Sequence, residues 1–298
     1  MLFLLLPLTV VLTGIAGAFL AKVALRPVHK MIATIHQIRA ENLKLRIDVP
    51  ATRDEIQALA VTFNEMIARL DESFTSQRQF MEDISHELKT PLAILKGELE
   101  VALKKVRPAA EYETVLFSSL EEVNRLVRIV ENLLTLARFD TKTVTLEPEP
   151  LNLNELIQSA LDDVRVLAQQ KSIILSFHHR QPVFLNADRN QIRRLVLNLL
   201  DNALKYTPGG GTISVDLGQE QEAIKIEVSD TGTGIPQGDL PRIFDRFYRV
   251  EKSRGGSGFG LGLSISKSIV EAHHGRIDVQ TTLNRGSIFT IFFPRHLN

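Results

Sequence analysis

The most constraining feature of the sequence is a long run of apolar residues at coiled-coil spacing. Between residues 56 and 99 such residues recur at steps of mostly three and four: Ile56, Leu59, Phe63, Met66, Leu70, Phe74, Met81, Ile84, Leu88, Leu92, Leu95 and Leu99. This spacing predicts a helix that buries a narrow stripe against other helices. Consecutive steps of four at 66–74 and at 84–92 resemble stutters, which unwind a supercoil locally.

A second stripe follows a break at Val106-Arg107-Pro108. Its members are Leu116, Leu120, Val123, Val127, Val130, Leu134 and Ala137. Two antiparallel helices cannot bury stripes this narrow alone, so the pattern predicts a four-helix bundle made by a homodimer. Upstream, residues 25–75 are expected to form a helix, an irregular connector and a second helix.

The first 21 residues are uncharged and would span a bilayer as a helix, which needs about 20 such residues. Lys22, Arg26 and Lys30 follow directly, which places everything after them in the cytoplasm and residues 1–21 in the lipid of the inner (plasma) membrane. The alternative is a cleaved signal peptide ending near Ala16-Gly17-Ala18. However, no basic residue precedes the apolar run, and the run is longer than such peptides need.

Charge and cysteine content exclude several functions. Lys+Arg and Asp+Glu are both 35, which argues against nucleic acid as the main ligand. The chain has no cysteine, so disulfides, thiolate metal sites and cysteine nucleophiles are excluded.

After residue 143 the pattern changes to short mixed elements. Helices are expected at about 153–170, 188–206 and 261–274, and strands at 172–179, 183–186, 212–218, 223–230, 276–282 and 287–293. This order predicts an α/β two-layer sandwich with helices on one face of a mostly antiparallel sheet.

Three motifs in this region indicate nucleotide chemistry. In "RRLVLNLLDNALKYTP", Asn198, Asn202, Lys205 and Tyr206 share one helix face. Amide oxygens can hold a hard cation, a lysine suits phosphate, and a tyrosine ring suits adenine. Taken alone, this face favours the interpretation as the solvated side of an ordinary helix.

The other two motifs are rich in glycine. In "VSDTGTGIP", Asp230 ends an apolar strand and could accept a hydrogen bond from an exocyclic amine, while Gly232 and Gly234 let backbone approach a ligand. In "GGSGFGLGLSISKSIV", five glycines open a helix whose N-terminal N–H groups could bind phosphate. The Gly-Lys-Ser/Thr of a Walker loop is absent from it.

Together the three motifs resemble the Bergerat-type ATP-binding domain of histidine kinases, gyrases and related ATPases. "IFDRFYRV" (243–250) resembles the lid of histidine kinases, "SHELKTPL" (85–92) resembles their phosphoacceptor box, and residues 25–75 resemble a HAMP relay. The chain as a whole resembles a membrane sensor histidine kinase of a two-component system.

The resemblance implies a multidomain fold. Its expected parts are a transmembrane helix (1–21), a helical HAMP signal relay (22–75), a helical hairpin for dimerisation and phosphotransfer (76–142) and a Bergerat ATP-binding domain (143–298). It also implies a kinase that autophosphorylates His86 from ATP and passes the phosphoryl group to an aspartate in the receiver domain of a response regulator, and that also acts as the phosphatase of that regulator.

The resemblance implies a role for each matching residue. His86 is the nucleophile, Glu87 its orienting acid, and Thr90 the residue that positions water for dephosphorylation. Asn202 coordinates Mg²⁺. The implied nucleotide contacts are Asn198, Asn202, Lys205, Tyr206, Asp230, Gly232, Gly234, Ile235, Arg246, Arg249, Gly258, Gly260, Leu261 and Gly262.

Two other functions stay open. A Bergerat ATPase clamp would close a dimer without forming phosphohistidine, and a silent scaffold would only relay or bind.

Two local expectations also follow from the residues. Pro91 removes a helical hydrogen bond beside His86, which could let the helix bend. His273 and His274 are expected to end a helix as dipole-complementing cations before a capping Gly275.

Overall fold

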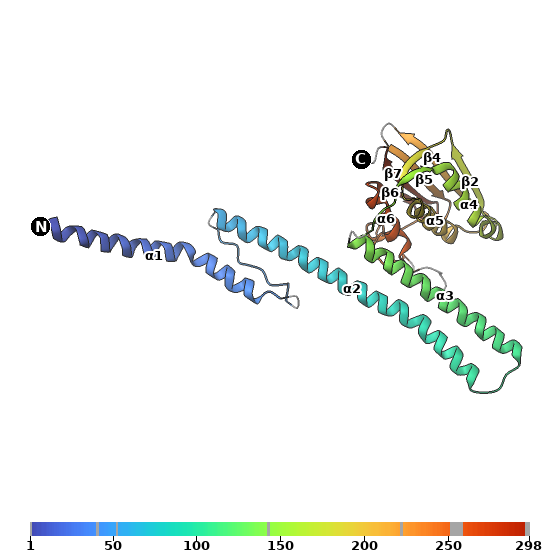
Figure 1. Ribbon diagram of the computed structural model, residues 1–298, viewed down its shortest axis with the longest axis horizontal. Coiled ribbons are helices and arrows are strands. Elements are labelled where there is room, and N and C mark those ends of the chain that lie inside the picture. Colours follow the sequence, from blue (N-terminus) through green and yellow to red (C-terminus); the bar gives the residue numbers. More distant parts are fainter. Residues whose placement is uncertain are drawn as a thin grey trace. The chain divides into compact units, whose positions relative to one another are not determined.

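The computed structural model describes residues 2–39, 42–51, 53–141, 144–220, 223–250 and 259–295; the side chains of 2–11, 21, 23 and 24 also lie outside the description. The chain divides into two compact units, Met1–Ile84 and Ser85–Asn298. Helix α2 (Glu55–Leu103) contributes to both units (Figure 1).

The first unit has the helix–connector–helix order expected from the sequence. Helix α1 (Leu2–Gln37) precedes an irregular connector, and Asp54 starts α2 by accepting backbone N–H groups of its first turn. Asn64 of α2 holds the connector through two 2.9 Å hydrogen bonds to the backbone of Ile47. A small apolar core joins the parts: Met31, Ile47, Ala60, Ile35, Ile56 and Phe63.

The predicted membrane span of residues 1–21 overlaps α1. Residues 1–11 and 21 of that span are among those whose side chains are not described. Within the described ranges, no helix is both long and apolar enough to cross a membrane.

The hairpin matches the expected break in the helical stripes. Helix α3 (Ala109–Asp140) begins after Pro108 and runs antiparallel to α2 (Figure 1), with Ser118 donating to Glu98 across the pair at 2.8 Å. Pro91 lies inside α2 and is buried. Many stripe residues are 40–62% exposed in the single chain: Leu92, Leu99, Leu116, Leu120, Val123, Val127, Val130 and Leu134. The hairpin therefore does not bury its own stripes.

The remaining elements form the expected two-layer α/β sandwich. Its sheet has the order β2-β4-β5-β7-β6, with β2 parallel to β4 and the other pairs antiparallel. The strands are β2 (Ile174–His179), β4 (Thr212–Glu220), β5 (Ala223–Asp230), β6 (Arg276–Thr282) and β7 (Gly286–Pro294). Helices α4 (Leu153–Gln170), α5 (Arg189–Tyr206) and α6 (Gly262–Ala272) pack on the sheet, and a 3-10 turn (η1) covers Leu240–Arg242.

One strand was not expected. β1 (Glu149–Asn152) pairs antiparallel with β3 (Phe184–Ala187) as a separate two-stranded ribbon. Its four residues include Pro150, and a proline in so short a segment favours a loop when only the sequence is considered.

The helix end at His273 corrects an expectation. His273 is 2% exposed, its Nδ1 lies 2.8 Å from the Ile269 carbonyl, and its Nε2 accepts the Asp188 N–H at 3.2 Å. Burial lowers the pKa of His273, so the ring is a neutral bridge rather than a cation. The left-handed cap is also His274 (φ 57°) instead of Gly275.

Candidate functional site

The polar face of α5 is the first part of the candidate nucleotide site. Asp188 caps this helix by accepting two backbone N–H groups at 3.0 Å. One face then presents Asn198 and Asn202, both half-buried, and Asn198 donates its amide N–H to the Gly262 carbonyl at 3.2 Å. Asn198 thus ties α5 to the first residue of α6, which brings two predicted motifs together.

The end of α5 presents a cation beside an aromatic ring. Tyr206 is 43% exposed, and the Lys205 ammonium lies 4.9 Å from the centroid of its ring. Lys205 therefore covers part of the ring that was predicted to stack on adenine. An anion bound here would therefore contact the Lys205 ammonium beside the Tyr206 ring.

Asp230 is a buried carboxylate at the end of β5. It is 9% exposed and accepts the Gly232 N–H at 2.7 Å. Burial raises the pKa of Asp230, and hydrogen bonds from the backbone of Gly232 and Ser287 oppose that rise. A buried acceptor held by two donors is suited to reading one N–H of a ligand.

Gly232 brings Asp230 and α5 into contact. A Cβ at this position would lie 2.6 Å from both Asp230 Oδ1 and the Tyr206 carbonyl oxygen, so only glycine fits. The next residue, Thr233, donates its backbone N–H to the same carbonyl at 3.2 Å. The first and second motifs are therefore neighbours in space.

Gly234 and Ile235 follow this turn and lie against the β6–β7 hairpin. Gly234 has φ +67°, and a Cβ there would lie 2.2 Å from the Thr282 carbonyl oxygen. The backbone N–H of Ile235 donates to the Thr281 hydroxyl at 2.9 Å. The β6–β7 hairpin, which comes later in the chain, thus holds the turn in place.

The third motif is described only in part. Gly260 has φ +68°, and a Cβ would lie 2.6 Å from the Phe247 carbonyl carbon. Leu261 is buried and Gly262 starts α6, whose N-terminus has no side-chain cap. Uncapped N–H groups at a helix start suit an anion. The expected contact Gly258 lies outside the described residues.

The segment before the third motif carries the two arginines that were expected to contact phosphate, Arg246 and Arg249. Arg246 forms an ion pair and hydrogen bond with Asp140 at the end of α3. Arg249 is half-buried. A phosphate contact by Arg246 would have to compete with Asp140.

His86 lies on α2 with its side chain exposed. Glu87 is half-buried, and its orienting role stays a prediction. Thr90 is exposed and donates its hydroxyl to the His86 carbonyl at 3.2 Å. These three residues share about one turn of helix just before buried Pro91.

Sequence reasoning missed Gly286 and Ser287. Gly286 (φ +110°) would place a Cβ 1.8 Å from the Asp230 carbonyl oxygen, and Ser287 is directly opposite Asp230 in the β5–β7 register. No motif marks them. Only the strand pairing reveals them.

Three family profiles match in the expected order. The HAMP domain matches residues 19–72, the His Kinase A (phospho-acceptor) domain residues 76–142, and the histidine kinase-, DNA gyrase B- and HSP90-like ATPase residues 187–297. The sensor histidine kinase CusS of Escherichia coli (strain K12) is 38% identical over 270 residues, 90% of this chain and 56% of CusS. The chain belongs to the sensor histidine kinases.

A second relative and a solved structure agree. The probable sensor kinase SilS of Salmonella typhimurium is 37% identical to this chain over 276 residues, 90% of this chain and 55% of SilS. The chain thus spans about half the length of these two relatives. The histidine kinase ThkA, solved in complex with response regulator protein TrrA, shares the fold (TM-score 0.62, 23% identity, 82% of this chain and 68% of that chain).

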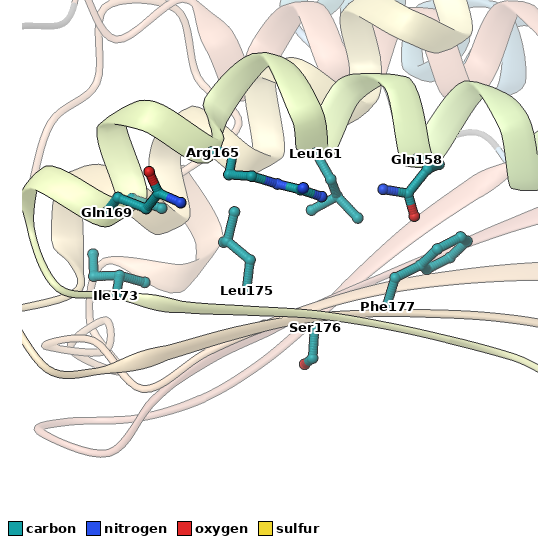
Figure 2. A pocket seen from close by; sticks show the side chains of 9 residues that line it. Gln158, Leu161, Arg165, Gln169, Ile173, Leu175, Ser176 and Phe177 are labelled. Carbon is teal, nitrogen blue, oxygen red and sulfur yellow. The ribbon is translucent and has the colours of Figure 1, made fainter.

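A surface groove of about 430 Å³ lies between α4 and edge strand β2 (Figure 2). Leu175 and Phe177 of β2 form its apolar floor, and Leu161 and Arg165 line it from the side of α4. None of the predicted site residues lines it.

Proposed function

We propose that this chain is an ATP-dependent protein-histidine kinase. It phosphorylates itself on His86, transfers the phosphoryl group to an aspartate of a response regulator, and removes phosphate from that regulator. The domain boundaries expected from the sequence (1–21, 22–75, 76–142 and 143–298) are part of the proposal. The observation that supports it best is that one chain carries both an exposed histidine on α2 and a separate α/β domain in which the buried Asp230 is held in place as a hydrogen-bond acceptor.

ATP would bind between the end of α5 and the start of α6. Asp230 accepts the adenine amine, while Tyr206 and Lys205 meet the base and phosphates. Asn202 and Asn198 offer neutral amide oxygens, a donor set that fits Mg²⁺ when the phosphates supply the charge. Bound Mg²⁺ would neutralise charge on the phosphates.

At His86, a neutral imidazole nitrogen attacks the γ-phosphorus. The P–N bond forms as the bond from the γ-phosphorus to the β–γ bridging oxygen breaks, and ADP leaves with that oxygen. The other ring nitrogen keeps its proton, and the Glu87 carboxylate stabilises the resulting cation. For the proposed phosphatase activity, Thr90 positions the water that attacks the phosphorylated aspartate of the regulator.

The partners follow from the same surfaces. The exposed apolar stripes on α2 and α3 are proposed to pack against a second copy of the chain. The solved ThkA complex supports a response regulator as the phosphate acceptor. Residues 1–21 are proposed to anchor the kinase in the inner membrane, with the catalytic part in the cytoplasm.

The test is incubation of the full chain with γ-labelled ATP and Mg²⁺. Wild type and the control His178→Gln, an exposed histidine on β2, should acquire acid-labile, base-stable label. His86→Gln and Asn202→Ala should not. ATP turnover without label on wild type would favour the ATPase clamp, and label on another residue would refute the assignment.

A further inference from the structure

The chain between the second and third motifs winds through consecutive tight turns. Four backbone N–H groups each donate to the carbonyl three residues earlier, at 2.8–3.3 Å: those of Asp239, Arg242, Asp245 and Tyr248. The apolar side chains of the same segment pack into or against the core of the α/β domain: Leu240, Ile243, Phe244 and Phe247. The segment is therefore joined to this domain along its length.

A tyrosine side chain closes this run of turns. The Tyr248 hydroxyl donates to the Asp239 carboxylate at 2.5 Å, nine residues earlier, and the Arg242 guanidinium carbon lies 4.4 Å from the centroid of the tyrosine ring. Arg242 also pairs with Asp245 at 3.6 Å. The hydrogen bond to Asp239 raises the pKa of Tyr248, so the phenol keeps its proton and remains a donor at neutral pH. The ring is thus held at its hydroxyl and over its face.

The residue before this tyrosine has an unfavourable backbone conformation. Phe247 has φ +59°, in the left-handed region that residues with a side chain disfavour. Gly260 lies directly against it, because a Cβ there would be 2.6 Å from the Phe247 carbonyl carbon and 2.8 Å from the Tyr248 carbonyl oxygen. Such a conformation persists only where surrounding contacts determine it. The hydrogen bond from Tyr248 to Asp239 is one of these contacts, because it fixes the residue that follows Phe247.

Gly260 connects this segment to the start of α6. Two residues later Gly262 begins the helix, and its carbonyl accepts the Asn198 amide N–H at 3.2 Å. A shift of the peptide between Phe247 and Tyr248 would therefore move Gly260, and with it the uncapped N–H groups at the start of α6. The proposed adenine acceptor, Asp230, is held by other contacts, the backbone N–H groups of Gly232 and Ser287.

We propose that Tyr248 is a positioning residue for the phosphates of the nucleotide: through Asp239 it holds the Phe247–Tyr248 peptide against Gly260 and so sets the start of α6. The proposal rests on the proposed function, in which ATP binds between α5 and the start of α6. Loss of this hydrogen bond reduces the population that binds phosphates and leaves the recognition of adenosine by Asp230 unchanged. A general loss of folded structure would instead weaken the binding of both.

The test measures the Kd of the full chain for two probes. Calorimetry is used for Mg²⁺–AMPPNP, a non-hydrolysable ATP analogue, and ligand-observed NMR for adenosine. Tyr248→Phe keeps the ring beside Arg242 but removes the hydroxyl. It should raise the Kd for Mg²⁺–AMPPNP about two- to tenfold, the affinity equivalent of one ordinary hydrogen bond, and change the Kd for adenosine by less than about twofold.

Variants of Asp239 separate the hydrogen bond from other effects of the tyrosine. Asp239→Ala should match Tyr248→Phe, whereas Asp239→Asn, whose amide oxygen can still accept from the phenol, should lie between Asp239→Ala and wild type. Combining Tyr248→Phe with Asp239→Ala should add little, because both remove the same contact. The matched control is Tyr112→Phe on α3, whose hydroxyl donates to the Lys105 carbonyl at 3.4 Å; both of its Kd values should equal those of wild type.

Three results would overturn the positioning role. Tyr248→Phe could bind Mg²⁺–AMPPNP as tightly as wild type, its affinity for adenosine could fall by the same factor, or Asp239→Ala could have no effect. A wild-type chain that fails to bind either probe would instead refute the proposed nucleotide site.

Discussion

The neutral bridge formed by His273 should carry a measurable part of the stability of the nucleotide domain. His273→Phe keeps a ring beside Phe293, whose centroid lies 6.1 Å away, but removes both ring nitrogens. The Asp188 N–H then loses its acceptor in a buried setting, which costs about 1–3 kcal/mol. The Ile269 carbonyl still receives the His273 backbone N–H, so the lost ring bond there costs only about 0.5–1.5 kcal/mol. The expected loss is about 1.5–4.5 kcal/mol.

Native-state hydrogen exchange at amides of α5 and α6 would measure this loss locally, because exchange reports the free energy of opening of each region. The pH dependence adds an independent check. The folded pKa of His273 is depressed, so its contribution is complete above the ordinary histidine pKa of about 6.5 and is lost as pH falls below it. Wild type and His273→Phe should therefore differ more at pH 8 than at pH 5. The control His274→Asn suits the left-handed conformation and should change stability by less than about 0.5 kcal/mol. A difference that is independent of pH, or below about 1 kcal/mol at pH 8, would refute the reasoning.

Four further outcomes are expected. Asp230→Asn should raise domain stability in thermal unfolding, because it removes a buried charge, while nucleotide affinity falls about 5- to 150-fold through a lost acceptor; retained affinity would contradict the assigned role. Gly234→Ala should destabilise the domain by more than about 2 kcal/mol in urea denaturation, because φ is +67° and the new Cβ meets the Thr282 carbonyl. Leu120→Lys should weaken the dimer at least about tenfold in sedimentation, since each copy exposes a leucine worth about 1.5–3 kcal/mol when buried. Pro91→Ala restores a helical donor beside His86 and should change the ratio of kinase to phosphatase rates; unchanged rates would argue against bending at this proline.

Helices and strands could be told apart in the sequence because apolar residues recur every three or four positions in a helix and every second position in a strand. Residues 223–230 and 276–282 alternate in burial and form strands at the expected bounds. The stripe along α3 repeats at helical spacing, and its break before Pro108 is where the hairpin turns. The ribbon strand at 149–152 escaped prediction because it is short and contains Pro150.

The candidate site was harder to predict where long-range pairing decides it. Asp230 and its glycines stand out as a motif, but the partners Gly286 and Ser287 become visible only through the β5–β7 register. In the same way, the role of His273 depends on Asp188, a residue 85 positions earlier in the chain. Local sequence carries propensity and period, whereas these contacts depend on which distant segments the core brings together.

The geometry around Gly232 explains why the site can depend on residues that touch no ligand. The Asp230 carboxylate and the Tyr206 carbonyl both occupy space next to the missing Cβ of this glycine, and the Asp230 carbonyl does the same at Gly286. The approach at Gly232 fixes the end of α5 against the end of β5, and the approach at Gly286 fixes the start of β7 against the same end of β5. Because neither approach allows a side chain, the position of the acceptor is set by backbone packing. We therefore expect the proposed recognition of nucleotide by Asp230 to depend on how tightly a helix end, a strand end and a hairpin pack together.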